Sequence, residues 1–202
     1  MMNNNYTNFW NDIQVNNTSF TDTELDIKPK VDHIALAGYR RAIGNFVNIV
    51  TNRSDIVVRY QSNGDSYTDG KVVTIGSKID QKNFDHVVGL ALHEGSHVLL
   101  SDFSFLRNLE QNAPQEIINQ GINRGYDKFE VLGHLKNMLN YVEDRRIDYY
   151  VFSTSPGYKG YYHAMYNKYF HSKAIDKALK DNTFGNDKTY QNYEARIINL
   201  TN

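Results

Sequence analysis

The residues best suited to chemistry are two histidines and a glutamate near the middle of the chain. They stand together as His93-Glu94-Gly95-Ser96-His97, with apolar residues on both sides. In a helix, residues four positions apart lie on one face, so both imidazoles can reach one metal ion while Glu94 points at its open coordination position. This HExxH pattern predicts a zinc hydrolase, in which a zinc-activated water attacks a peptide carbonyl and Glu94 acts as general base.

The alternative is that His93 and His97 are ordinary core or surface histidines. Buried and unpaired imidazoles are costly, which favours the metal site. The chain has no cysteine, so only histidine and carboxylate remain as metal ligands of the kind zinc uses.

A catalytic zinc site of this type needs a third protein ligand, and the segment 128–152 offers two neighbouring acids, Glu143 and Asp144. No proline interrupts this segment and its apolar residues recur at helical spacing, so we expect a helix. On a helical wheel Glu143 falls on the apolar side and Asp144 away from it. A carboxylate on a buried face needs a partner such as a cation, so the wheel favours Glu143 as third ligand and predicts that Asp144 and Arg145 are exposed.

Asp148, on the same predicted helix, has two interpretations. Its carboxylate could accept a hydrogen bond from the free ring nitrogen of a ligating histidine. The other interpretation is that the acidic and basic residues 143–148 form a solvated, ion-paired helix end.

Together, the two segments resemble the gluzincin type of zincin metallopeptidase. The resemblance is nearest to metallopeptidase modules of bacteria and their phages that often accompany von Willebrand A domains and MoxR-type ATPases. These modules share an Asn-x-x-Glu-Asp-x-Arg signature on the glutamate helix. Besides the HExxH run, the residues that carry the resemblance are Asn140-Tyr141-Val142-Glu143-Asp144-Arg145-Arg146-Ile147-Asp148.

The resemblance is specific over residues 80–152 and implies one zinc ion bound by His93, His97 and Glu143, with Glu94 as the catalytic base. It also implies a peptide or protein substrate, and a von Willebrand A domain or ATPase as partner. The chain departs from better-known gluzincins at one position. Their second acid follows the ligand glutamate by four residues, where this chain has Ile147.

Gluzincins also commonly supply a Tyr or His after the third ligand to stabilise the tetrahedral oxyanion. Here the candidates are Tyr158, Tyr161, Tyr162 and His163, with Tyr161 and His163 as our choice. Aromatic residues in such a stretch otherwise serve packing. In the same family the strand before the HExxH helix borders the substrate cleft, so an extended peptide is expected to pair with residues 71–75, at Val73.

The remaining sequence predicts an α+β, mostly helical chain: a minimal zincin fold with a small sheet beside the active-site helix. A polar N-terminal arm, residues 1–30, precedes one zincin-like metallopeptidase domain, residues 31–202, which is large enough to bury one core. The final predicted helix has no Gly or Pro stop, as in the front part of a longer polypeptide. The expected elements are a helix at 32–52, strands at 56–60 and 71–75 joined by a hairpin-like loop, a helix at 80–100, a short helix at 115–119, a helix at 128–152, a helix after 156–157 and a helix at 190–200.

Charge and hydropathy limit the classes of binding partner and the location that we expect. The net charge is −1 with no block of like charge, which gives no reason to expect nucleic acid or a membrane surface. The N-terminus lacks the features of a signal peptide and no stretch reaches about 18 apolar residues, so we expect a cytoplasmic protein. The resemblance implies that this cytoplasm is that of a bacterial cell or a phage-infected host.

Two other functions remain open at this point. One is a catalytically silent zincin-fold binding or phage structural module with a structural zinc, against which the intact Glu94 argues. The other is a metal-free helical domain.

Overall fold

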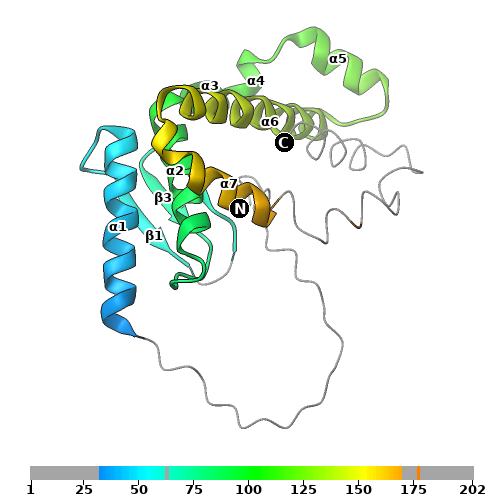
Figure 1. Cartoon of the computed structure of the whole chain (residues 1–202). Coiled ribbons are helices and arrows are strands. Elements are labelled where there is room, and N and C mark those ends of the chain that lie inside the picture. The colour runs from blue at the N-terminus through cyan, green and yellow to red at the C-terminus, as the bar shows by residue number, and fades with distance from the viewer. Residues whose placement is uncertain (1–31, 62–63, 170–176, 178–202) are drawn as a thin grey trace.

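The computed structural model describes residues 32–61, 64–169 and 177 (Figure 1). The predicted N-terminal arm, 1–30, and the predicted helix at 190–200 lie outside the described residues. Helices make up most of the described chain, and one three-stranded sheet packs beside them. The expectation of a mostly helical α+β fold with a small sheet is confirmed.

Helix α1, His33–Thr51, begins and ends at local signals in the sequence. The Asp32 carboxylate accepts hydrogen bonds from the backbone N–H groups of Ile34 and Ala35, which satisfies two donors of the first turn. The helix ends where Asn52 adopts the left-handed conformation, with φ 52°. Ile43 and Val47 are fully buried on the face that packs against helix α2.

The sheet contains strands β1, Val57–Tyr60, β2, Tyr67–Thr68, and β3, Val72–Ile75, in the order β1-β3-β2. β1 pairs with β3 in parallel, so the predicted hairpin between these two strands is wrong. The chain instead passes to the far side of β3, forms β2, and then turns back. The Asp69 carboxylate accepts from two backbone N–H groups of this turn and Gly70 supplies φ 89°, so the tight turn joins β2 to β3.

This strand order corrects the predicted substrate strand. Val73 lies in the central strand, opposite Val58 on one side and Thr68 on the other, and its side chain is fully buried. Its backbone hydrogen-bonding positions face neighbouring strands, so no peptide can add at Val73. The edge strands of the sheet are β1 and the short β2.

Helix α2, Phe84–Leu100, carries the HExxH run and lies at the centre of the fold (Figure 1). Every residue from His86 to Ser96 is buried. Helices α1 and α7 both pack against it, and two glycines permit the close approach. A Cβ at Gly89 would lie 2.5 Å from the carbonyl oxygen of Tyr161, and one at Gly95 would lie 2.6 Å from Val50 Cγ1.

The acidic segment reaches α2 on the long helix α6, Lys128–Thr154, which crosses it in Figure 1. A capping box starts α6, because the Asp127 side chain accepts from the Glu130 backbone while the Glu130 side chain accepts from the Asp127 backbone. The predicted short helix at 115–119 is present and extends to residue 123. The other elements are α3, Phe103–Arg107, α4, Leu109–Asn112, α5, Gln115–Asn123, the 3-10 helix η2, Pro156–Tyr158, and α7, Lys159–Tyr169.

Within the described ranges, no helix combines the length and the apolar character that crossing a membrane requires.

Candidate metal centre

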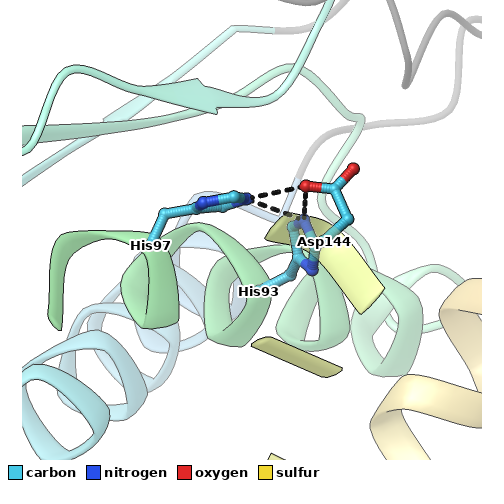
Figure 2. A group of neighbouring side chains, drawn as sticks. All are labelled: His93, His97 and Asp144. Carbon is cyan, nitrogen blue, oxygen red and sulfur yellow. Dashed lines mark hydrogen bonds and ion pairs between the residues drawn. The ribbon is translucent and has the colours of Figure 1, made fainter. Parts of the chain in front are cut away.

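Three side chains from α2 and α6 converge on one buried point (Figure 2). His97 Nε2 lies 3.2 Å from His93 Nε2 and 3.1 Å from Asp144 Oδ1, and His93 Nε2 lies 3.6 Å from the same oxygen. Among the described residues, these three form the group whose ligand atoms lie close enough to hold a metal ion.

The separations of the three atoms are close to those expected around one tetrahedral metal ion. Zinc binds nitrogen and oxygen at about 2.0 to 2.2 Å, which places neighbouring ligand atoms about 3.3 to 3.6 Å apart. The observed 3.1, 3.2 and 3.6 Å therefore describe nearly one face of such a tetrahedron.

The hydrogen bonds of His93 determine which of its ring nitrogens carries the proton. Its Nδ1 lies 2.9 Å from Asp148 Oδ1, and the other oxygen of Asp148 accepts from Arg145 Nη2 at 3.0 Å and from the Tyr166 hydroxyl. A carboxylate surrounded by donors is an acceptor, so the Nδ1–H of His93 donates to it. The lone pair of Nε2 then faces Asp144. This is the contact that the predicted role of Asp148 requires.

His97 also has its Nδ1 hydrogen-bonded, in this case to a serine. Its Nδ1 lies 2.9 Å from Ser101 Oγ, and the Ser101 hydroxyl donates to Glu143 Oε1 at 2.6 Å. A hydroxyl has one proton, so Ser101 must accept from the Nδ1–H of His97. The Nε2 of His97 is therefore also an acceptor.

Three acceptor atoms thus face one another in a buried corner, which calls for a cation or a proton between them. Burial alone lowers the pKa of His93, but the charges and hydrogen bonds of Asp148 and Asp144 raise that pKa well above its ordinary value. Burial alone raises the pKa of Asp144, yet hydrogen bonds and charge from His93 and His97 lower it to about 2. The site is built to hold positive charge, and the donor set fits a metal such as zinc.

The acid that faces the histidines is Asp144, so the predicted orientation of the two neighbours is wrong. Asp144 is 2% exposed, whereas the Glu143 side chain is 24% exposed and points to Ser101 and Arg146. The wheel failed because it averaged over the whole helix and counted Met138 and Val142 as buried, although they are 38% and 64% exposed.

The buried face of α6 changes along its length. Its first half packs beside α4 and α5, and its second half packs against α2. A shorter window holds the signal that the wheel missed. Residues at i, i+3, i+4 and i+7 form a buried row in the second half, namely Asp144, Ile147, Asp148 and Val151.

Glu94 is 4% exposed and lines a cavity of about 470 Å³ beside the three converging side chains. Burial raises the pKa of Glu94, although His93 and His97 partly oppose this. The rest of the cavity wall comes from the end of β2, from α3 and the two residues before it, and from the middle of α6. These residues are Thr68, Asp69, Ser101, Asp102, Phe103, Phe105, Leu106, Arg107, Lys136, Leu139, Asn140 and Glu143.

The structure does not bring the predicted oxyanion donors to this cavity. Tyr161 packs its ring against Phe46, with 5.4 Å between centroids, and exposed His163 packs against Phe152 at 5.6 Å. Tyr162 is fully buried in the core and the half-buried Tyr158 also packs near Phe46. None of the four lines the cavity.

The phenol that reaches the site is that of Tyr166, through Asp148. The helical spacing of Tyr162, Met165 and Tyr166 indicates the inward face of α7. It does not indicate which phenol meets a carboxylate, because that depends on where α7 docks.

We found no match to the chain among protein-family models, curated proteins or solved structures. The interpretation of the site therefore depends on its own geometry, and the gluzincin resemblance stays a prediction.

Proposed function

We propose that this protein is a zinc-dependent peptidase in which His93, His97 and Asp144 bind one Zn²⁺ and Glu94 is the general base. The observation that carries the proposal is the convergence of two imidazole nitrogens, from His93 and His97, and one carboxylate oxygen, from Asp144, at one buried point beside a cavity.

The donor set favours zinc over the harder cations. Two imidazole nitrogens and one carboxylate oxygen suit Zn²⁺, whereas Mg²⁺ and Ca²⁺ prefer oxygen ligands alone. When bound at such a site, Zn²⁺ supplies Lewis acidity, which makes water a stronger acid and polarises a carbonyl.

Glu94 is placed to move the proton of the reaction. It follows His93 directly on α2 and lines the cavity, so its carboxylate lies beside the space where water and substrate would meet. In peptide hydrolysis it takes a proton from the attacking water and delivers it to the leaving amine. A buried carboxylate whose pKa is raised suits both steps, because it binds the proton more readily and still releases it.

The open cavity favours catalysis over a silent structural zinc. Structural zinc sites are closed by four protein ligands, whereas catalytic sites keep one position for water or substrate. Here three side chains of the described residues converge, and the remaining side faces a cavity whose volume is typical of ligand sites.

Part of the cavity wall is apolar, which supports a peptide substrate with a bulky apolar side chain near the cleaved bond. Phe103, Phe105 and Leu106 contribute from α3, and Leu139 contributes from α6. Burial of such a side chain is worth about 1.5 to 3 kcal/mol, which is enough to select it over a small one.

The test is digestion of a peptide library by zinc-loaded wild type and by Glu94→Gln. We expect the variant to keep its zinc, measured by elemental analysis, and to cleave about 100-fold or more slowly. Glu110→Gln is a matched control, because Glu110 is exposed, pairs with Lys128 and does not line the cavity. Absence of cleavage by both zinc-loaded proteins would refute the peptidase and leave the silent binding module.

A further inference from the structure

The C-terminal end of α2, one turn beyond His97, is hydrogen-bonded both within its own backbone and to α6. Ser101 is the C-cap residue, and its backbone N–H donates to the carbonyl of His97 at 2.9 Å. Arg146 on α6 donates from Nη2 to the carbonyl of Leu100 at 2.8 Å. The last turn of α2 is therefore attached to α6 at its backbone.

Arg146 also forms two hydrogen bonds with Glu143, which lies on the same helix. Arg146 Nε donates to Glu143 Oε2 at 2.7 Å and Nη2 donates to Oε1 at 2.6 Å, a two-point contact between guanidinium and carboxylate. Glu143 Oε1 also accepts from the Ser101 hydroxyl. An ionised carboxylate can only accept hydrogen bonds, so the single hydroxyl proton of Ser101 is donated to Glu143. The serine oxygen then accepts from His97 Nδ1.

We propose that Ser101, Glu143 and Arg146, here called the His97 clamp, fix the protonated nitrogen and ring direction of His97. Glu143 is then a positioning residue for the metal centre and not a ligand. This inference depends on the proposed metal site.

The clamp supplies a hydrogen-bond acceptor for the Nδ1–H of His97, as Asp148 does for the Nδ1–H of His93. Asp148 touches the Nδ1 of His93 directly, whereas the carboxylate that serves His97 acts through a hydroxyl. Both arrangements commit Nδ1 as a donor and leave Nε2 for the metal. Loss of such an outer partner typically weakens metal affinity 10- to 100-fold, since the ring is no longer held in one tautomer and orientation.

The experiment compares zinc affinity, by competition with a chelator, in wild type, Ser101→Ala, Ser101→Thr and Glu143→Gln. We expect Ser101→Ala and Glu143→Gln to bind about 10- to 100-fold more weakly, yet still to hold one zinc at saturation. Ser101→Thr keeps the hydroxyl and should bind within a few-fold of wild type. Glu110→Gln is the control for loss of an ion-paired glutamate, and thermal melting verifies that each variant is folded.

Long-range proton–nitrogen NMR of histidine-labelled protein supplies the readout that a merely structural role would not change. With or without zinc, wild-type His97 should carry its proton on Nδ1, and Ser101→Ala should lose the hydrogen-bonded Nδ1 proton signal while His93 keeps its own. An Nε2-protonated His97 in wild type overturns the clamp. A zinc affinity of Glu143→Gln within twofold of wild type would also overturn it. Failure of Glu143→Gln to hold one zinc at saturation would overturn it as well, because Glu143 would then be a ligand. Failure of the wild type to bind zinc would refute the proposed function. The NMR result would then test the clamp independently of zinc.

Discussion

Asp144 and Asp148 lie one turn apart on α6 and contact opposite nitrogens of one imidazole. Asp148 Oδ1 is 2.9 Å from His93 Nδ1, and Asp144 Oδ1 is 3.6 Å from His93 Nε2. The helix repeat places both carboxylates on the face that meets α2. Asp148 therefore orients the ring, while Asp144 and His97 both lie near its Nε2.

Asp144→Asn should reduce zinc affinity by more than about 100-fold, because it removes a proposed ligand and not merely an outer partner. The measurement is chelator competition, with Asp85→Asn as control, since Asp85 is exposed at the start of α2. Unchanged affinity in Asp144→Asn would exclude Asp144 from the metal site.

Zinc affinity should rise with pH through and beyond the ordinary histidine value of 6.5, because the raised pKa of His93 means that zinc must displace a proton held there. Below that raised pKa, each pH unit should cost about tenfold in affinity for one displaced proton. Asp148→Asn removes a carboxylate that raises this pKa, so its affinity should stop rising at a lower pH.

The stability of the metal-free fold should change with pH in the opposite direction from zinc affinity. Stabilisation from a raised histidine pKa is complete below pH 6.5 and is lost as pH rises through the raised value. Titration of zinc affinity and of metal-free stability over the same pH range checks both statements. A zinc affinity that is flat above pH 6.5 would contradict the first.

Tyr166→Phe should destabilise the protein by about 1.5 to 3 kcal/mol, the typical value of a hydrogen bond to a charged group. The phenol donates to Asp148, which is buried, so its loss leaves that carboxylate with fewer donors. Urea unfolding measures the effect. Tyr149→Phe serves as control, since Tyr149 is 76% exposed, and should change stability by less than about 0.5 kcal/mol.

Gly89→Ala should destabilise the fold by about 1 to 3 kcal/mol, because the new Cβ would lie 2.5 Å from the Tyr161 carbonyl oxygen and would push α7 from α2. Gly133→Ala is the opposite case within a helix. Nothing lies within 4 Å of its Cβ position, so the higher helix propensity of alanine should add up to about 1 kcal/mol. Thermal melting compares the two. Equal shifts would show that packing at Gly89 does not limit the approach of α7.

The sequence alone determined the helix that carries His93, Glu94 and His97, and the long helix that carries the acids. Apolar periodicity and the absence of proline act over a few residues, so they can be read without knowing which segments pack together. Runs of β-branched residues, which are also a local signal, identified β1 and β3.

The tertiary structure decided which acid joins the histidines, which strand lies at the edge and which tyrosine reaches the site. Helix geometry fixes the angle between Glu143 and Asp144 but not which side meets α2, because the two halves of α6 pack against different partners. Likewise, the insertion of β2 beyond β3 made Val73 central, and the docking of α7 brought Tyr166 rather than Tyr161 to Asp148. Each of these outcomes depends on contacts between distant segments, which no local pattern encodes.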